Sequence, residues 1–409
     1  MTSTIPPTLE LATPNPELRR AATGPAIINL LREHDGISRT ELAKRLGVSN
    51  QAVSKTVIRL MGDGLVRETG RQSIGVGKAR TKLSLVPRSR YALGMHLDRS
   101  SFVVSLVNLT GEVEGSISSS FETVPSPEDA VETLRAASAE LLGISPKTKK
   151  RLVGGGLGMA GPVDHTRGIA TAPHNFSGWH NVPLALLLSD AIGTPILIDN
   201  EANMAMAAEH WRSGRAGWTV VMYVGTGLRA AMMLDGDVYH GSHSNAGEVG
   251  HMVVDPAGPL CVCGRRGCVE VFSSPAAAVE RYFAKTGKAQ PCKNSMGPTW
   301  SKDTLGQLTE LSSHAKRGES AAREALRESG AYLGIAAANL ATLLDIDQIV
   351  LAGPMLSLLG ADFVAGAEEE LARNEKDPGR NTRIIVSSDL RSDAIARGSA
   401  LIAMGNVGT

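Results

Sequence analysis

Four residues close together in the chain have the side chains and the spacing of a metal site: His251, Cys261, Cys263 and Cys268. Three thiolates and one imidazole form a closed tetrahedral set for Zn²⁺, and a set with no open position indicates a structural ion. Gly258, Gly264 and Gly267 provide bends that would let a short loop wrap around the ion. We therefore expect a structural zinc ion at this loop.

The same residues have two other interpretations. A disulfide framework would spread its cysteines along the chain, whereas three of the four here are clustered. Small buried thiols beside an unrelated histidine are the second alternative. Clustering in a chain that we expect to be cytosolic favours the metal site. Cys292 lies far outside the cluster, in a polar stretch, and is interpreted as an ordinary loop thiol.

The first part of the chain has the pattern of a helix-turn-helix. Apolar residues recur at helical spacing between residues 26 and 34. Ser38 can then cap a further helix, with Glu41 capping back three residues later. That helix is expected to end at Leu46, because Gly47 can adopt the left-handed conformation of a helix stop.

A second helix of the motif is expected from residue 50 to residue 61. Val53, Val57 and Leu60 form an apolar stripe that can pack on the preceding helices. The opposite side carries residue types that hydrogen-bond to base edges and phosphates in a major groove. The residues expected to contact DNA from this helix are Ser49, Asn50, Gln51, Ser54, Lys55 and Arg59.

A β-hairpin with a basic tip is predicted next, from strand-like residues 64–67 and 82–86 and the Gly- and Arg-rich stretch between them. Residues 1–90 carry a net charge of +8 and the remainder −7. A small protein-binding module with a solvated basic face is the alternative, but the capped helices, polar face, basic wing and charge together favour double-stranded DNA as the partner. The wing residues expected to contact it are Arg71, Lys78 and Arg80.

The overall composition narrows the class of protein. A chain of 409 residues favours two or three structural units. No apolar run of about 18 residues is present, so we expect no membrane partner. The N-terminus is rich in Pro and Thr and has no basic-then-apolar export signal. Residues 1–18 are therefore expected to be a disordered lead-in and the protein to be cytoplasmic.

From residue 91 onward the pattern changes to alternating strands and helices, which indicates an α/β fold. Glycines follow several strands, as in Gly225-Thr226-Gly227, and suggest ligand sites at the carboxyl edges of the sheets. Strands are expected at 91–107, 152–157, 195–198, 220–224 and 348–352, and helices at 126–142, 200–211 and 332–344.

The segments 248–251 and 261–270, Glu-Val-Gly-His and Cys-Val-Cys-Gly-Arg-Arg-Gly-Cys-Val-Glu, resemble the signature of the ROK family of repressors, open reading frames and kinases. The resemblance extends from Tyr91 nearly to the end, and the head resembles the extension of the family's repressors. It implies a winged helix-turn-helix at 19–88 followed by a two-lobed, actin-like ATPase and sugar-kinase fold. The N-lobe would comprise 89–199 with 390–409, and the C-lobe, with the zinc loop and oligomerisation, 200–389.

The resemblance also implies a sugar site. In the family, sugar hydroxyls are held by an Asn after a Pro-rich turn, by an Asn beside the catalytic acid, and by two Glu and a His flanking the zinc loop. The matching positions, with the acid itself, are Asn175, Asn200, Glu201, Glu248, His251 and Glu270. Carboxylates and amides recognise hydroxyls by paired hydrogen bonds, and His251 would bind zinc with one ring nitrogen and offer the other to the sugar. Each residue alone could instead be a structural cap or turn residue.

The chain departs from the family's kinases where they bind ATP. Their Asp-x-Gly-Gly-Thr loop is matched by residues 96–100, His-Leu-Asp-Arg-Ser. Asp98 would repel phosphates, and the side chain of Arg99 would block the backbone approach that the glycines allow. The Gly-Gly pair on the adenosine side becomes Ala352-Gly353. We therefore expect no ATP.

Two further departures concern the reaction itself. Arg229 replaces a glycine in the second loop, an ambiguous change because arginine also favours phosphate. Glu201 replaces the catalytic Asp and reaches about one bond further, and a misplacement of about 1 Å can lower a rate on the order of a hundredfold. The hypothesis is a sugar binder with no catalytic residue and no enzymatic activity, in which Glu201 still bonds a sugar hydroxyl.

Two functions remain in competition. The first is a transcriptional regulator, with repression inferred from the family, in which a homodimer or homotetramer binds operator DNA and a sugar or sugar phosphate changes that binding. Some family repressors respond instead to a phosphotransfer protein of sugar transport. The second function is an ATP-dependent hexose or N-acetylhexosamine kinase with a DNA-binding appendage, and it requires Glu201 to act as the base.

Overall fold

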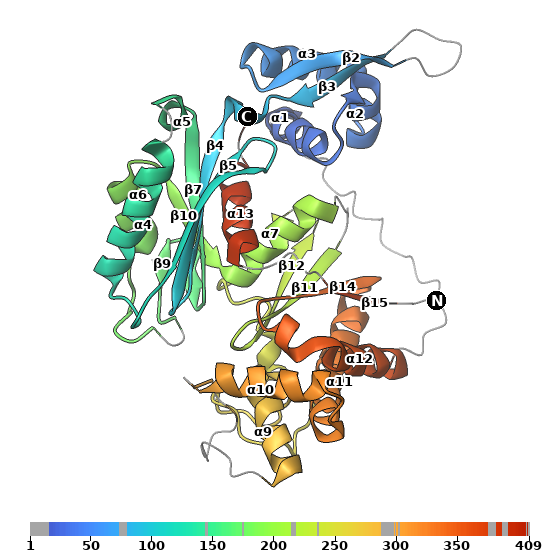
Figure 1. Ribbon diagram of the computed structural model, residues 1–409. Coiled ribbons are helices and arrows are strands. Elements are labelled where there is room, and N and C mark those ends of the chain that lie inside the picture. Colours follow the sequence, from blue (N-terminus) through green and yellow to red (C-terminus); the bar gives the residue numbers. More distant parts are fainter. Residues whose placement is uncertain are drawn as a thin grey trace, which may run out of the picture. The chain divides into compact units, whose positions relative to one another are not determined.

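The computed structural model describes residues 16–72, 80–143, 146–173, 176–213, 218–234, 237–287, 298, 300, 301, 303–374, 382–386, 392–405 and 407 (Figure 1). The chain forms two compact units. The first contains the described residues up to Arg90, the short segment Asn108–Glu112 and the described residues from Met404 onward. The second contains Tyr91–Val107 and Val113–Ala403.

The first unit is a winged helix-turn-helix. Its helices are α1 (Pro16–Glu33), α2 (Arg39–Leu46) and α3 (Asn50–Gly62), followed by the 3₁₀ turn η1 (Pro87–Ser89). Its strands are β1 (Ile37–Ser38), β2 (Val66–Gln72) and β3 (Arg80–Leu85). They form an antiparallel sheet in the order β1-β3-β2, so that β2 and β3 make the predicted wing.

Local sequence signals set the ends of these helices. The Ser38 hydroxyl accepts from the backbone N–H of Glu41 at 3.3 Å, and Gly47 ends α2 with a φ of 63°. The Ser49 hydroxyl caps α3 by accepting from the N–H of Ala52 at 3.2 Å. Each of these three predictions is confirmed. The carboxylate of Glu41 accepts a bond from Arg45 at 3.0 Å.

Arg32 ties together three separate segments of this unit. Its Nε donates to the backbone oxygen of Leu109 at 2.7 Å, its Nη1 donates to Asn29, and its Nη2 contacts the sulfur of Met404 at 3.7 Å. Burial lowers the pKa of the guanidinium to about 9. The first helix is therefore fixed to a turn and to a tail that lie far away in the sequence.

The second unit contains two mixed five-stranded sheets, as the α/β prediction requires. The first has the order β10-β7-β4-β5-β6, with β4, β7 and β10 parallel. Its elements are β4 (Tyr91–Leu97), β5 (Ser101–Asn108), β6 (Val113–Ser120), β7 (Leu152–Met159) and β10 (Ile196–Asn200), with helices α4 (Pro127–Gly143), α5 (Pro146–Lys150) and α6 (Leu184–Ile192) and the small hairpin β8 (Val163–Asp164) and β9 (Ile169–Ala170).

The expectation of one strand from 91 to 107 was wrong. The structure places a turn between β4 and β5, and the turn is stabilised by Asp98. The carboxylate of Asp98 accepts from the N–H of Arg99 at 2.8 Å and from the hydroxyl of Ser100 at 3.2 Å. The sequence held a signal for this break, because residues 98–101 are four consecutive polar residues at the junction of two strands that are buried almost throughout.

The second sheet has the order β13-β12-β11-β14-β15, with β11, β14 and β15 parallel. Its strands are β11 (Trp218–Val224), β12 (Leu228–Leu234), β13 (Asp237–Val238), β14 (Gln348–Ala352) and β15 (Arg383–Val386). The accompanying helical elements are α7 (Glu201–Ser213), η2 (Val249–His251), α8 (Glu270–Ser273), α9 (Pro275–Thr286), α10 (Thr304–Lys316), α11 (Ser320–Leu344), α12 (Leu356–Asn374) and α13 (Ser392–Ala403). Within the described part of the chain, no helix combines the length and apolar character needed to cross a membrane.

Helix α13 lies in direct backbone contact with α7 and with the first sheet, because glycines face it. A Cβ added at Gly398 would lie 1.9 Å from the carbonyl oxygen of Met204 on α7. A Cβ at Gly94 of β4 would lie 1.7 Å from the oxygen of Ala396, and one at Gly156 of β7 would lie 2.3 Å from the oxygen of Ser399. A side chain at any of these positions would force the elements apart.

A matched pair of substitutions tests this packing. Gly398→Ala should lower the free energy of unfolding by about 2 kcal/mol, because the clash outweighs the helix propensity of alanine. Gly306→Ala, in α10 and with no atom within 4 Å of its Cβ position, should raise that free energy by up to about 1 kcal/mol. Urea unfolding of both variants measures the difference. If both substitutions stabilised the protein, the close contact would be refuted.

Candidate functional site

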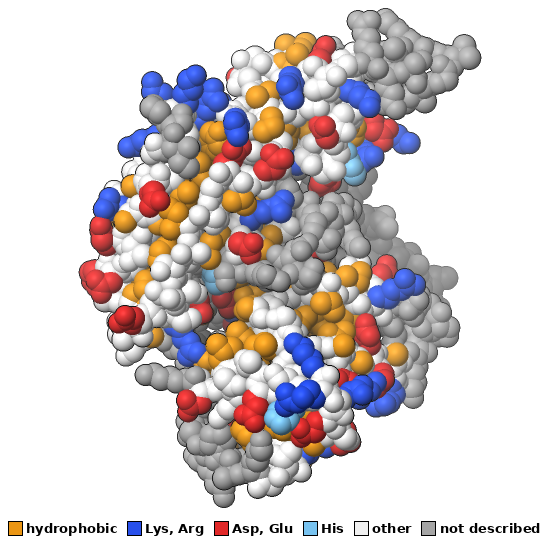
Figure 2. Space-filling view, viewed as in Figure 1, with side chains coloured by type: hydrophobic (Ala, Val, Ile, Leu, Met, Phe, Trp, Pro, Cys, Tyr) orange, Lys and Arg blue, Asp and Glu red, His pale blue; other side chains and the backbone are white. Residues whose placement is uncertain are grey.

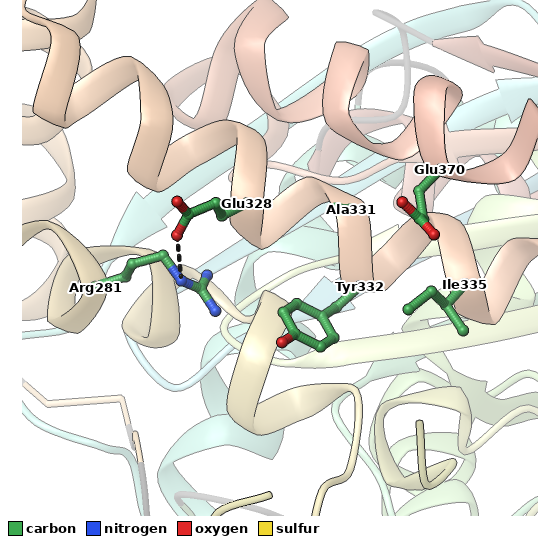
Figure 3. A pocket seen from close by; sticks show the side chains of 6 residues that line it. All are labelled: Arg281, Glu328, Ala331, Tyr332, Ile335 and Glu370. Atoms are coloured by element: carbon green, nitrogen blue, oxygen red, sulfur yellow. Dashed lines mark ion pairs between the residues drawn. The ribbon is translucent and has the colours of Figure 1, made fainter. Parts of the chain in front are cut away.

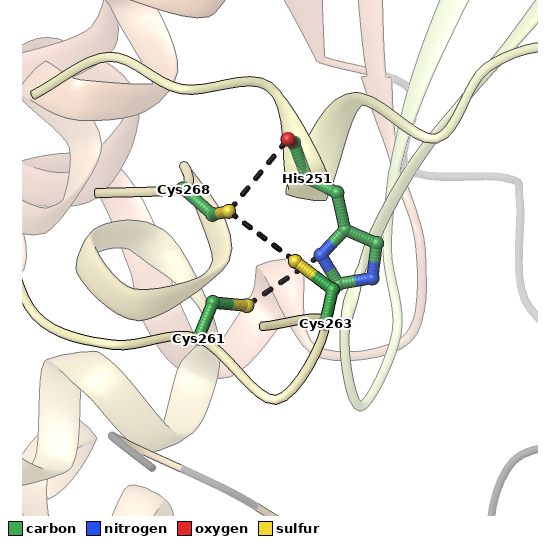
Figure 4. A group of neighbouring side chains, drawn as sticks. All are labelled: His251, Cys261, Cys263 and Cys268. Carbon is green, nitrogen blue, oxygen red and sulfur yellow. Dashed lines mark hydrogen bonds between the residues drawn. The ribbon is translucent and has the colours of Figure 1, made fainter. Parts of the chain in front are cut away.

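The predicted metal ligands converge in one loop (Figure 4). All four ligand atoms of His251, Cys261, Cys263 and Cys268 lie within 4.8 Å of one another. The Sγ of Cys261 is 3.6 Å from Nδ1 of His251, and the Sγ atoms of Cys263 and Cys268 are also 3.6 Å apart. A tetrahedral zinc ion with Zn–S bonds of about 2.3 Å has edges of about 3.8 Å. The group therefore fits a four-ligand metal ion.

Glycines allow the loop to close in the way that the sequence predicted. Gly267 has a φ of 68°, and a Cβ there would lie 1.4 Å from the carbonyl oxygen of Asp255. A Cβ at Gly258 would lie 2.6 Å from the ring of Phe272, and Gly264 has a φ of 85°. No other residue type could occupy position 267 without moving the backbone.

Loss of one ligand should release the metal. Cys268→Ser should reduce the bound metal from one ion per chain to almost none and should lower the melting temperature, because the loop would lose the ion that closes it. Cys292→Ser is the control and should keep both properties. Elemental analysis with thermal melting makes the measurement, and a Cys268→Ser protein that kept its metal would contradict the assignment.

Glu270 lies beneath the glycine turn 225–227 that joins β11 to β12. Its Oε2 accepts from the N–H of Leu228 at 2.9 Å. A Cβ at Gly227 would lie 3.0 Å from its Oε1, and one at Gly250 would lie 2.7 Å from its Oε2. Burial raises the pKa of Glu270 to about 7, with a further upward contribution from Glu248 and an opposing one from the Leu228 N–H. This carboxyl can therefore donate or accept near neutral pH.

Glu201 begins α7 and is hydrogen-bonded to a residue of the altered first loop. Its Oε2 is 3.2 Å from Nε2 of His96, whose ring is buried. Its Oε1 lies 3.5 Å from a Cβ built at Gly225, so Glu201 and Glu270 border the same glycine turn. Asn200 is buried at the end of β10, where its side-chain oxygen caps α7 by accepting from the N–H of Ala202 at 2.9 Å.

Glu248 forms an ion pair with Arg229 of β12. Arg229 also donates through Nη2 to the carbonyl oxygen of Ala246 at 3.0 Å. A Cβ at Gly161 would lie 2.9 Å from Nδ2 of Asn200 and 3.8 Å from Nη1 of Arg229. The structure thus brings Asn200 and Arg229 to one point, whereas Asn175 lies outside the described residues.

Sequence reasoning missed a histidine pair beside Asn200. The rings of His165 and His240 stack with their centroids 3.6 Å apart. Nε2 of His240 lies 2.7 Å from the carboxylate of Asp199, and Nδ1 of His165 lies 2.8 Å from the hydroxyl of Ser244. The histidines at 240 and 243, close to Ser244, were a visible signal, but nothing local linked them to position 165.

The stacked rings of His165 and His240 should make the stability of the second unit fall at acidic pH. Burial, and then the charge of His240, lowers the pKa of His165, against opposing effects of Asp199 and Asp164. Because the unfolded histidine has the higher pKa, near 6.5, the unfolded chain binds more protons and stability falls as the pH drops through about 6.5.

Substitution of His165 tests this pH dependence. His165→Phe keeps a ring and removes the proton site, so it should flatten the loss of stability between about pH 7 and pH 5. His180→Gln, at an exposed position, should leave the slope of the parent. Urea unfolding across the pH range gives the comparison. Equal slopes for His165→Phe and the parent would rule out the titration.

The residues predicted to contact DNA occupy the exposed side of α3. Ser49, Asn50, Gln51, Lys55 and Arg59 are exposed and Ser54 is partly so. Val53, Val57 and Leu60 are fully buried, so the two-faced helix is confirmed. Backbone positions Arg71 and Arg80 belong to β2 and β3 at the end of the hairpin next to its connecting loop, and Lys78 lies outside the described residues. Their contacts with DNA stay predictions.

Two other surface features lie apart from these residues. Figure 2 shows Lys and Arg side chains gathered over α5, which carries Lys147, Lys149 and Lys150. A hollow of about 360 Å³ lies among helices α9, α11 and α12 (Figure 3). Its Arg281 is paired with Glu328 at 3.5 Å and lies over the ring of Tyr332 at 5.7 Å. None of the predicted site residues lines this hollow.

Comparison with known proteins agrees with the fold. Residues 94–406 match the model of the ROK family, and residues 22–67 match a winged helix-turn-helix DNA-binding model. The chain therefore belongs to the ROK family, as its sequence signature implied. A solved ROK family transcriptional regulator, a homologue of the Escherichia coli MLC protein, superposes with a TM-score of 0.75 at 23% identity over 95% of this chain and 97% of that one. The predicted fold, a winged helix-turn-helix followed by an actin-like sugar-kinase fold, is confirmed.

The curated relatives include both transcriptional regulators and sugar kinases. The xylose repressor of Caldicellulosiruptor bescii is 26% identical over 84% of this chain and 85% of its own length. The E. coli protein described as the DNA-binding transcriptional dual regulator NagC is 24% identical over 83% and 82%. A glucokinase of Halalkalibacterium halodurans is 31% identical, but over only 51% of this chain and 63% of its own length.

Proposed function

We propose that the protein is a DNA-binding repressor of carbohydrate genes whose operator affinity is set by a sugar or sugar phosphate. The observation that carries the proposal is the union in one chain of a capped helix-turn-helix, with an exposed polar face, and a kinase-like body. The relatives named xylose repressor and NagC match this chain over 84% and 83% of its length. Acting on operator DNA, the protein would work in the cytoplasm.

The head would recognise DNA with α3. Its exposed polar residues would enter a major groove and the wing would contact adjacent phosphates. Two heads are needed to read half-sites about one helical turn apart, so a homodimer or homotetramer is expected. Direct control by a phosphotransfer protein of sugar transport is an alternative input to the same head.

The body would bind the sugar with Asn175, Asn200, Glu201, Glu248, His251 and Glu270. Of these, the described residues border the glycine turn 225–227, Gly161 or the metal loop. The metal would be a structural Zn²⁺, since three thiolates and one imidazole suit zinc and leave no position open for substrate. The ion would thereby hold the loop that carries Glu248 and Glu270 at its ends.

We further propose that the protein is not an enzyme. Glu201 occupies the position of the catalytic acid but is hydrogen-bonded to His96, which replaces the first acidic residue of the kinase loop. The imidazole of His96 would compete with a sugar hydroxyl for Oε2 of Glu201, which weakens its case as a general base. Arg99, at a former glycine position, lies 5.5 Å over the ring of Trp300.

The kinase alternative has support from the glucokinase relative and is tested directly. An assay of sugar-dependent ADP release with common hexoses and N-acetylhexosamines should detect turnover well below about 1 s⁻¹, the lower end of typical enzymes. Turnover above that rate, abolished by Glu201→Gln, would establish a kinase in place of a pure regulator.

DNA binding should depend on the exposed cations of α3. Lys55→Ala and Arg59→Ala should each weaken binding several-fold and reduce the magnitude of the salt slope by about 1, because each removes one phosphate contact. Lys147→Ala on α5 is the matched control and should leave binding unchanged. Titration of an operator fragment, identified first by genomic footprinting, gives both quantities. Equal losses in all three variants would indicate a nonspecific charge effect.

The proposed control of operator affinity by a sugar needs a separate measurement. Addition of the effector sugar should change operator affinity by about 5- to 150-fold, the usual range of allosteric coupling. A panel of neutral and phosphorylated sugars is titrated into the operator complex. If no sugar alters the affinity, regulation by a carbohydrate is wrong.

A further inference from the structure

We infer that the effector is an acidic carbohydrate, carrying a phosphate or a carboxylate, and that Arg229 binds the acidic group. This inference rests on the proposed function and names the chemical class of its ligand. Four observations concerning Arg229 support it: its place, its unused hydrogen-bonding capacity, its exchangeable partner and the charge balance around it.

Arg229 extends into the group of residues that would hold the sugar. Its Nη1 lies 3.8 Å from a Cβ built at Gly161, which is also 2.9 Å from Nδ2 of Asn200. The Arg229 side chain is only 11% exposed. A cation with so little water around it gains more from an anionic ligand than a surface arginine would.

The guanidinium has hydrogen-bonding capacity to spare. It carries five N–H donors in a planar fork. Nη1 bonds to Glu248 and Nη2 to the carbonyl oxygen of Ala246. Nε is buried and has no partner among the described residues. Phosphates and carboxylates match this fork with two parallel bonds, which a neutral hydroxyl cannot do.

Glu248 occupies the place that the acidic group of the ligand would take. Its side chain is 39% exposed, so its carboxylate can turn toward solvent or toward a ligand without a large rearrangement. When a ligand anion replaces it on Arg229, Glu248 becomes able to accept from ring hydroxyls. A neutral sugar that drew Glu248 away would leave the buried guanidinium without an acidic partner.

The other carboxylates nearby do not oppose an anion strongly. Glu201 is bonded to the imidazole of His96 at 3.2 Å, and Glu270 accepts from the N–H of Leu228 at 2.9 Å. The pair of Arg229 and Glu248 is therefore the exchangeable ion pair of the site, in which a ligand anion would take the place of Glu248 on Arg229.

Calorimetry on the full-length protein tests the inference with matched ligands. The probes are glucose with glucose 6-phosphate, glucose 1-phosphate and glucuronate, N-acetylglucosamine with its 6-phosphate, xylose with its 1-phosphate, and inorganic phosphate alone. For at least one sugar, the acidic form should bind at least tenfold more tightly than the neutral form. Comparison of the affinities for the glucose phosphates and for glucuronate shows which anionic group is preferred.

Two variants of one position complete the experiment. Arg229→Met should weaken binding of the acidic form at least thirtyfold and should not weaken binding of the neutral form, which no longer has to draw Glu248 away from Arg229, whereas Arg229→Lys should lose less, since it keeps the charge but not the fork. Metal content and circular dichroism confirm that both variants fold. If Arg229→Met folds poorly, Arg229→Lys takes its place in the test. The ratio of the affinities for the acidic and neutral forms should then be smaller for Arg229→Lys than for the parent.

The outcomes separate this inference from the proposed function. If neutral sugars bind and shift operator affinity as strongly as acidic ones, or if Arg229→Met binds the acidic form as tightly as the parent does, the regulator stands and the role of Arg229 is wrong. Binding of inorganic phosphate as tight as that of any sugar phosphate also overturns the inference. If no carbohydrate binds or alters operator affinity, the proposed function fails as well.

Discussion

Closure of the loop between His251 and Cys268 is the constraint on which the site depends. Gly267 lies so close to the carbonyl of Asp255 that only a residue without a side chain fits there. That contact brings the three thiols and the imidazole within reach of one ion. Because Glu248 precedes the loop and Glu270 follows it, the same closure sets the positions of both carboxylates. A bound metal ion would hold the loop rigid, and it would thereby fix the carboxylates of Glu248 and Glu270 that are proposed to bind small molecules.

The altered positions of the kinase-like body form pairs with one another and with neighbouring site residues. His96 is bonded to Glu201, and Arg229 is paired with Glu248. By the resemblance, three of these four residues, His96, Glu201 and Arg229, differ from the residues of the family's kinases, and each pair joins a carboxylate to a nitrogen-bearing side chain. The buried imidazole of His96 and the largely buried guanidinium of Arg229 each gain a hydrogen-bonding partner in this way.

Local chemistry was predictable from the sequence, and long-range pairing was not. The caps at Ser38 and Ser49 and the ligand set of the metal loop depend on residues a few positions apart, so their spacing carries the information. The stack of His165 on His240 joins residues that are distant in sequence, and only the fold brings them together. Arg229 was recognised as a departure from the kinases, but its partner Glu248 was interpreted only as a sugar ligand. The break at Asp98 was missed, although the run of four polar residues at 98–101 marks the junction of two buried strands.

The attachment of Arg32 to Leu109 and Met404 has a consequence for how such regulators could be recombined. The compact unit that contains the head is not formed by the N-terminal segment alone. It also includes the turn at Asn108–Glu112 and the C-terminal tail. A chimaera spliced at Arg90 would give a foreign head a turn and a C-terminal tail that had never been matched to it. Exchange of specificity between relatives would have to transfer all three segments together, and natural shuffling of heads among bodies would face the same requirement.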